Sequence, residues 1–321
     1  MRRRDFLGVL TTAIGSTAIP AKIFHGDQSA PFQVYEYKTA GGCVIEADVH
    51  GADKNIKKPV LMYIHGGALI GGTRKKLPKV VPDLLLKMGY VVVLIDYRLA
   101  PETKLPAIVE DVQDAILWIR RDGPKLFHID PDRLAIVGDS AGGYLTLMTG
   151  FRVKPRPRVL AVFWGYGDII SPWYSKPDAF YLKRPRVSKE EAYQSVGTKC
   201  LTEPAESNQR GRFYLYCRQN GLWPQEIAGH DPHVEPEWFN AYRPVHNVSK
   251  EYPPTILVHG TADTDVPYEE SKTMAQKLEE AGVEHELITV SGGGHGLAEI
   301  SDAEMTRIYE KVAAFLRANM G

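Results

Sequence analysis

Short apolar runs alternate with amphipathic segments along most of the chain. The apolar runs consist of consecutive Val, Ile and Leu positions and have the length of buried β-strands. The segments that follow them repeat apolar residues every three or four positions, as one face of an α-helix does. The pattern predicts strands at 59–64, 90–95, 133–137, 159–164, 255–259 and 284–290. It predicts helices at 77–88, 106–120, 141–151, 268–281 and 302–319.

The order of these elements predicts the class of fold. Strands that are apolar throughout and alternate with helices are typical of a parallel sheet covered by helices on both faces. Two β-rich runs at 32–38 and 43–50 come first and predict an antiparallel pair. We therefore expect an α/β protein with a doubly wound, mostly parallel sheet of about eight strands. It would form a single domain over residues 32–321.

The alternation stops between about residues 165 and 252. This stretch is rich in Pro, Trp and Tyr, and an irregular loop of that length is improbable in a compact domain unless it has structure or function of its own. We expect a mostly helical insertion that caps the core. Its aromatic residues either form a small core of the cap or line a ligand pocket. They are Trp173, Tyr174, Phe180, Tyr181, Trp223, Trp238, Phe239 and Tyr242.

The first residues have the layout of an export signal. A basic cluster at 2–4 precedes a mildly apolar stretch that contains small residues and is too short for a membrane anchor. The run Arg-Arg-Asp-Phe-Leu at 3–7 is similar to the core of the twin-arginine signal. We expect residues 1–21 to direct the precursor to the twin-arginine export machinery, and the mature protein to be periplasmic or extracellular. An amphipathic N-terminal helix is the alternative.

Charge and cysteine content narrow the possible functions. The 321-residue chain carries 39 basic and 39 acidic side chains, so it lacks the basic excess of a nucleic-acid-binding protein. Cys43, Cys200 and Cys217 form no C-x-x-C pair, which argues against a zinc or thioredoxin-like site. We expect three free thiols, although an exported protein could join Cys200 to Cys217. The His and acidic residues of segment 230–235 match no zinc spacing, so no metal is expected.

The strongest chemical signal lies between a predicted strand and a predicted helix. Residues 138–142 are Gly-Asp-Ser-Ala-Gly and fit the motif G-x-S-x-G, which requires that strand-to-helix context. In such a turn the serine backbone is strained and its hydroxyl is raised above the sheet. Gly138 and Gly142 are required because a β-carbon there would collide with neighbouring backbone. Ser140 is therefore the predicted nucleophile.

A serine hydroxyl needs a base to take its proton and an acid to orient that base. Asp263 and His295 lie in the loops after the last two predicted strands. Both loops leave the carboxyl ends of strands, where open α/β sheets place their sites. We expect His295 to take the proton of Ser140 and Asp263 to hold its second ring nitrogen. Asp265 is the alternative acid, or it caps the following helix.

With these motifs the sequence resembles the α/β-hydrolases, close to the hormone-sensitive-lipase-like carboxylesterases and related small serine esterases. The matching segments are 65–68, 96–102, 130–133, 138–143 and 295–296. The resemblance implies an α/β-hydrolase fold with Ser140 as nucleophile, Asp263 as acid and His295 as base, and such chemistry needs no cofactor. It also implies oxyanion donors at the backbone N–H groups of Gly67, Ala68 and Ala141.

Two features depart from the family pattern. Ala68 stands where the family usually has a third glycine, and only its N–H is needed there. The acid loop at 259–267 is more similar to those of thioesterases and feruloyl esterases, which bears on the substrate rather than on the chemistry. Other polar residues near the motifs are expected to be structural. They are His65, Arg98, Glu102, Asp139, His259, Glu269 and Glu270.

These observations predict an exported carboxylic ester hydrolase that forms an acyl-enzyme on Ser140. Its substrate would be a short-acyl, acetyl or aryl ester of a small molecule or a carbohydrate. A serine peptidase of the prolyl-oligopeptidase type is the second hypothesis, although those enzymes usually carry an N-terminal propeller domain. A hydrolase-fold binding protein without turnover is the third, and the complete Ser–Asp–His set argues against it.

Overall fold

The computed structural model describes residues 22–24, 32–76, 86–204 and 210–321. Within these ranges the chain forms a nine-stranded sheet with the order β1-β2-β3-β5-β4-β6-β7-β8-β9. The first three strands and the β3–β5 pair are antiparallel, and every later pair is parallel. The strands are β1 (Lys22–Phe24), β2 (Phe32–Ala40), β3 (Cys43–His50), β4 (Lys58–Ile64), β5 (Val91–Ile95), β6 (Ile129–Asp139), β7 (Val159–Phe163), β8 (Thr255–Gly260) and β9 (His285–Val290).

The sheet confirms the predicted fold class, an α/β protein with a mostly parallel sheet. One strand was not expected: β1 pairs with β2, so the sheet begins before residue 32, the predicted start of the domain. The predicted export signal at 1–21 and most of the predicted helix at 77–88 lie outside the described residues.

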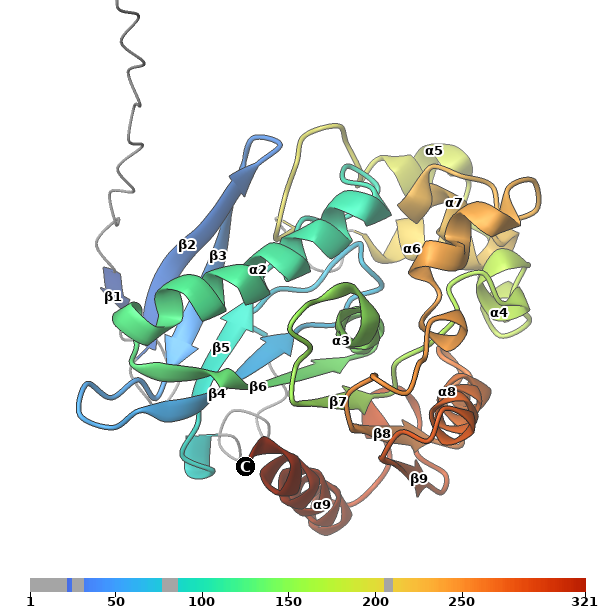
Figure 1. Cartoon of the computed structure of the whole chain (residues 1–321). Helices are drawn as coiled ribbons and strands as arrows, with labels where there is room; N and C mark the ends of the chain where they lie inside the picture. Colours follow the sequence, from blue (N-terminus) through green and yellow to red (C-terminus); the bar gives the residue numbers. More distant parts are fainter. Residues whose placement is uncertain (1–21, 25–31, 77–85, 205–209) are drawn as a thin grey trace, which may run out of the picture.

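Helices cover both faces of the sheet, as Figure 1 shows. Neighbouring residues of one strand point to opposite faces and enter different cores: Met62 belongs to the core under α2 and α3, and Tyr63 to the core under α9. The doubly wound arrangement therefore follows from strands that are apolar at every position. These helices are α2 (Leu105–Leu126), α3 (Ala141–Arg152), α8 (Tyr268–Glu280) and α9 (Asp302–Met320).

Helix α2 is longer than predicted. It continues past Arg120 through Gly123 and Pro124 and closes with a hydrogen bond from the Phe127 N–H to the Gly123 carbonyl. A proline this close to the end of a helix removes one intrahelical hydrogen bond, and the packing of the preceding turns outweighs that loss.

A group of short helices connects β7 to β8, in the part of the chain where the alternation of strand and helix stops. We call residues 165–252 the cap. Figure 1 shows its helices α4 to α7 grouped at one side of the sheet. The described elements of the cap are α4 (Pro172–Ser175), η1 (Tyr181–Lys183), α5 (Lys189–Tyr193), α6 (Gly211–Asn220), α7 (Trp223–Ala228), η2 (Pro236–Tyr242) and η3 (Pro244–His246).

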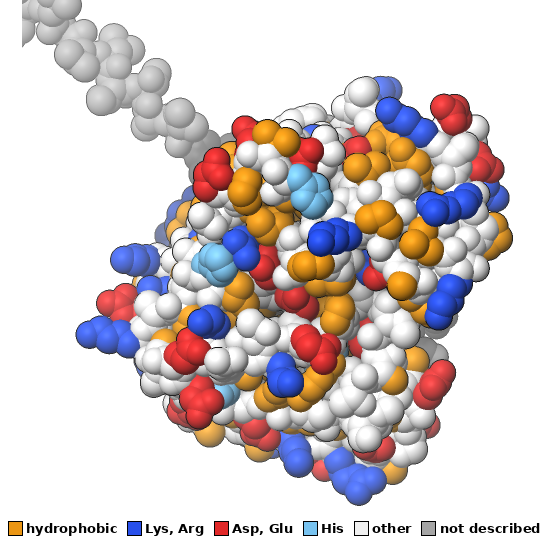
Figure 2. Space-filling model, turned by 90° about the vertical axis from the view of Figure 1, so that its right-hand side faces the viewer, with side chains coloured by type: hydrophobic (Ala, Val, Ile, Leu, Met, Phe, Trp, Pro, Cys, Tyr) orange, Lys and Arg blue, Asp and Glu red, His pale blue; other side chains and the backbone are white. Residues whose placement is uncertain are grey.

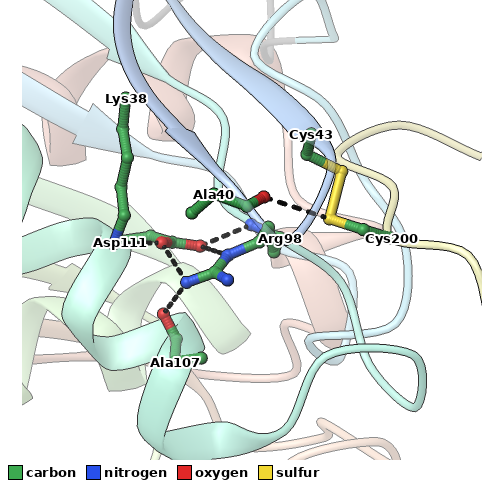
Figure 3. The surroundings of a disulfide bond; sticks show 7 residues. All are labelled: Lys38, Ala40, Cys43, Arg98, Ala107, Asp111 and Cys200. Atoms are coloured by element: carbon green, nitrogen blue, oxygen red, sulfur yellow. Dashed lines mark hydrogen bonds and ion pairs between the residues drawn. A yellow bond between two sulfur atoms is a disulfide. The ribbon is translucent and has the colours of Figure 1, made fainter.

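The prediction of three free thiols is wrong, and so is its alternative. Cys43 and Cys200 form a disulfide (Figure 3). Cys217 is free and buried in α6. The bridge spans 157 positions of sequence because the cap returns to the β2–β3 hairpin. Next to Cys200, the carbonyl of Leu201 accepts a hydrogen bond from the Leu99 N–H in the segment after β5. The disulfide ties the cap to the antiparallel edge of the sheet.

The surface fits the balanced charge of the chain. Figure 2 shows side chains of both signs interspersed over one face. Among the described helices, none is both long and apolar enough to cross a bilayer.

Candidate active site

The G-x-S-x-G turn joins the end of β6 to the start of α3. Ser140 stands between them with φ 51° and ψ −119°, a strained conformation for a residue with a β-carbon. Its N–H donates to the carbonyl of Phe163 on the next strand, at 2.9 Å. A β-carbon on Gly142 would collide with the carbonyl of Ile64, and one on Gly138 with the carbonyl of Gly142. The two glycines therefore let the backbone close tightly enough to hold Ser140 in this strained position.

Ser140, His295 and Asp263 come from three separate turns, and their side chains form a continuous row of contacts. His295 Nε2 is 3.2 Å from Ser140 Oγ, and its Nδ1 is 2.8 Å from Asp263 Oδ2. Because a carboxylate only accepts hydrogen bonds, Nδ1 carries the proton in neutral His295 and Nε2 presents its lone pair to the serine hydroxyl. This arrangement suits a base that removes the hydroxyl proton.

Asp263 is positioned by its own loop. Its Oδ1 accepts hydrogen bonds from the backbone N–H groups of Asp265 at 2.8 Å and Val266 at 2.9 Å, which leaves Oδ2 for His295. Burial alone would raise the pKa of this carboxyl, but hydrogen bonds from His259 and His295 outweigh burial and hold it well below its usual range. Asp263 is therefore a carboxylate at every pH at which His295 titrates.

His259 is a structural histidine, as predicted. Its Nε2 lies 3.0 Å from the carbonyl of Val266 and must donate, so its Nδ1 accepts from the Ser271 hydroxyl at 2.7 Å. Nε2 also lies 3.3 Å from Asp263 Oδ2. His259 thus joins the two ends of the acid loop and contacts Asp263.

The pKa of His295 is raised. Burial lowers it, but the hydrogen bond to Asp263 and the negative charges of Asp265, Asp263 and Asp139 together raise it above its ordinary value. These carboxylates stabilise the protonated form of His295. This is the form that arises when a base has taken the serine proton.

The loop after β4 lies beside the serine turn. Asp139 accepts hydrogen bonds from the Tyr63 hydroxyl at 2.6 Å and from the Gly66 N–H at 3.1 Å, which fastens the loop to the end of β6. Gly67 and Ala68 both have positive φ, 118° and 53°. The turn is closed by hydrogen bonds from the N–H groups of residues 70 and 71 to the Gly67 carbonyl. Asp139 is the structural residue that the sequence predicted.

The predicted site residues meet at one cavity of about 560 Å³. Ser140, His295, Gly67 and Ala68 line it, and Asp263 is buried behind His295. Ala141 is the first residue of α3, and the N–H groups of a first helical turn have no acceptor within their helix. The volume is in the range of small-molecule sites. The rest of the lining includes Trp164, Tyr214, Asp265, Met305 and Tyr309.

Asp265, the alternative acid, contacts the other side of the His295 ring. Its Oδ2 is 3.5 Å from His295 Nε2, the nitrogen that faces Ser140. Its Oδ1 accepts three hydrogen bonds from the cap, all between 2.6 and 2.7 Å. The donors are the hydroxyls of Tyr181 and Tyr214 and the guanidinium of Arg218. Asp263 therefore provides the carboxylate at Nδ1, and Asp265 is a second carboxylate held by the cap.

Sequence patterns did not reveal the contacts of Arg218 and Glu270. Arg218 is buried among aromatic rings of the cap and joins Asp265 to Asp178. Glu270, expected to be structural, is so through contacts with the cap: it accepts hydrogen bonds from the Trp173 indole and from the N–H groups of Gly167 and Asp168. Burial raises its pKa to about 7. No motif marks such residues, because their partners are distant in sequence.

His65, Arg98 and Glu102 make structural contacts, as predicted. His65 bonds the carbonyl of Gly66 through Nδ1 and stacks on Tyr97. Arg98 bonds Asp111, and Glu102 bonds Arg210, so each anchors a loop without pairing with the other.

Comparisons with known proteins agree with this architecture. The family described as alpha/beta hydrolase fold matches residues 61–299. Esterase LipC of Mycobacterium tuberculosis is 26% identical over 259 residues, covering 80% of this chain and 58% of LipC. The non-reducing polyketide synthase ausA of Aspergillus calidoustus is 27% identical over 346 residues, covering 92% of this chain but only 14% of the synthase.

A solved structure is similar over almost its whole length. A protein of unknown function from Staphylococcus aureus superposes with a TM-score of 0.74 at 24% identity, covering 90% of this chain and 99% of that one. At 24% sequence identity, this similarity supports the fold alone.

Proposed function

Because this chain belongs to the α/β hydrolase family and is of the esterase type, we propose that it is a serine carboxylesterase acting through Ser140, His295 and Asp263. The observation that carries the proposal is the unbroken line of contacts from Asp263 Oδ2 through both nitrogens of His295 to Ser140 Oγ, at the wall of a cavity. Hydrogen-bond reach between nucleophile, base and orienting acid is the geometric requirement of this chemistry.

The reaction follows from these contacts. Ser140 Oγ attacks the ester carbonyl carbon as its proton passes to His295 Nε2, and the carbonyl oxygen becomes an oxyanion. The backbone N–H groups of Gly67, Ala68 and Ala141 are the proposed donors to that oxyanion. The intermediate expels the alcohol, which takes the proton from His295. Water then repeats the sequence on the acyl-serine and releases the acid.

We further propose short-acyl or aryl esters as substrates, with a small molecule or a carbohydrate as the alcohol. The support is the moderate volume of the cavity and its apolar wall at Trp164, Met305 and Tyr309. Turnover of p-nitrophenyl esters from acetate to decanoate tests this, with a maximum expected at short chains. Efficient hydrolysis only of long chains would contradict it.

The decisive experiment replaces the nucleophile. Ser140→Ala is expected to lower kcat for p-nitrophenyl acetate by at least about 10⁴-fold, since the acyl-enzyme can no longer form. Its thermal unfolding should be close to that of the wild type, because the change removes one oxygen. p-Nitroacetanilide, an amide with the same acyl group, should resist the wild-type enzyme, which separates an esterase from a peptidase. Full activity of the variant would refute the proposal.

Export is proposed on separate grounds. The disulfide between Cys43 and Cys200 supports an oxidising compartment, where such bonds persist. Fractionation of cells that make the full chain, with and without Arg3→Lys and Arg4→Lys, tests the proposed signal. The wild type should appear in the periplasm or the medium and the variant in the cytosol.

A further inference from the structure

The loop after β4, which carries the proposed oxyanion donors Gly67 and Ala68, contains two strained residues in succession. Ala68 and Leu69 have φ angles of 53° and 60°, in the left-handed region that residues with a β-carbon rarely adopt. Such conformations persist where surrounding contacts fix them. The Leu69 carbonyl accepts a hydrogen bond from the Ala100 N–H at 2.8 Å. The Ala68 carbonyl accepts one from the Trp223 indole N–H at 3.0 Å. The first contact comes from the core, and the second comes from the cap.

Trp223 is rigidly held. It begins α7 and is completely buried. Its ring stacks on Tyr174 at a centroid distance of 3.9 Å and an interplanar angle of 11°, and the edge of Tyr166 meets it at 6.1 Å. A buried indole N–H requires an acceptor, and here the acceptor is the backbone of the loop. The aromatic stack therefore fixes the direction of the hydrogen bond that Trp223 gives to Ala68.

We propose that Trp223 is a positioning residue for the oxyanion hole: its indole N–H holds the Ala68 carbonyl, and so fixes the backbone immediately after the Gly67 and Ala68 N–H groups that are proposed to bind the reacting carbonyl oxygen. The inference rests on the proposed function, since it assumes that Gly67 and Ala68 bind the oxyanion. It makes the cap part of the catalytic machinery rather than only a cover. Because donors aimed at the oxyanion bind the transition state more strongly than the substrate, their misalignment lowers kcat more than it raises KM.

Trp223→Phe tests the inference, because phenylalanine keeps an aromatic ring in the stack but has no N–H. With p-nitrophenyl acetate, kcat is expected to fall about 10- to 100-fold, with KM within about threefold of the wild type. Trp173→Phe is the matched control. Trp173 lies in the same stack, 3.6 Å from Tyr174, but donates its N–H to Glu270 and not to the loop. Its kcat should stay within about threefold of the wild type.

A transition-state analogue gives a second readout. Ser140 Oγ adds to the carbonyl carbon of a phenyl trifluoromethyl ketone, its proton passes to His295, and the carbonyl oxygen becomes an oxyanion that the loop must bind. The inhibition constant should rise in Trp223→Phe by about the factor by which kcat/KM falls, and stay unchanged in Trp173→Phe. Trp223→His, which retains a ring N–H, should recover part of the loss and replaces the Phe variant if that variant does not fold.

The outcomes separate this inference from the function on which it rests. If Ser140→Ala abolishes hydrolysis but Trp223→Phe leaves kcat and inhibitor affinity unchanged, the positioning role is wrong and the esterase proposal stands. An equal loss in both Trp variants would also overturn the role, because it would reflect disruption of the stack. If the wild type does not hydrolyse the ester, or Ser140→Ala still does, the proposed function itself fails.

Discussion

The strand-end turns of the core and the helices of the cap are held together in different ways. The turns are fixed by backbone hydrogen bonds between neighbours in the sheet, such as Ser140 N–H to Phe163 and Ala262 N–H to Gly293. The cap is fixed mainly by long side chains that reach distant parts of the chain, such as Arg218 to Asp265. Backbone geometry depends on local sequence, whereas the contacts of the cap depend on the completed fold.

The two aspartates beside His295 show the same difference at a single site. Asp263 accepts two backbone N–H groups of its own loop and bonds Nδ1 of the imidazole. Asp265, two positions later, accepts three side chains of the cap and approaches Nε2. The core thus positions the proposed acid, which bonds the proposed base. The cap positions a carboxylate that interacts with the base chiefly through its charge.

The largest effect is expected when the core aspartate changes. In Asp263→Asn, Oδ1 must still accept the two backbone N–H groups, so the amide nitrogen faces His295. It would donate to Nδ1 and shift the imidazole proton to Nε2, where the ring can no longer accept the proton of Ser140. We expect kcat for p-nitrophenyl acetate to fall by on the order of 10⁴-fold.

Asp265→Asn is the matched control for that experiment, since it makes the same chemical change two residues away. Its kcat at pH 8 should stay within about threefold of the wild type. Equal losses in the two variants would mean that Asp263 and Asp265 do not differ in role as their contacts indicate.

This contrast explains what the sequence could predict. The turn around Ser140 was predictable because its cause is local: an apolar strand, two glycines in contact with backbone, and a helix start lie within a dozen residues. The loops of Asp263 and His295 were predictable because parallel strands deliver their carboxyl ends to one edge of the sheet. Asp265 remained an alternative acid, since sequence does not say which carboxylate faces which nitrogen.

The sequence predicted that a cap is present but not which contacts hold it. Its helices are short, and most of their stability comes from tertiary contacts rather than from a periodic pattern. The Cys43–Cys200 bridge was mispredicted because it joins the cap to a hairpin 157 positions away. Nothing in the local sequence of Arg218 or Trp223 indicates that each would bond a loop of the core.

An intermediate effect is expected from loosening the cap. Arg218→Met removes a buried guanidinium that bonds Asp178 at 2.9 Å and Asp265 at 2.7 Å and leaves both carboxylates without that partner. Both are partly exposed, so the loss should be smaller than for a fully buried pair. The free energy of unfolding should fall by about 2–4 kcal/mol, measured by urea denaturation.

Arg212→Met provides the control on the same helix. Arg212 pairs with Glu191 at 2.8 Å on the surface, and such exposed pairs contribute below about 1 kcal/mol. If the two variants lose the same stability, the cap is not held by the buried cluster around Arg218.

The smallest effect is a shift in pH dependence. The reactive form of His295 is neutral, so kcat/KM rises as pH increases through its pKa. The carboxylates that face His295 are Asp263, Asp265 and Asp139, and their charges raise this pKa. Asp265→Asn removes one of those charges at similar volume, so the acid limb of kcat/KM should move to lower pH. Tyr181→Phe removes one hydrogen bond to Asp265 but no charge and should leave the limb in place. An unmoved limb in Asp265→Asn would show that this carboxylate, which the cap holds in place, does not act on the base. The cap would then affect the chemistry only through the loop at Ala68.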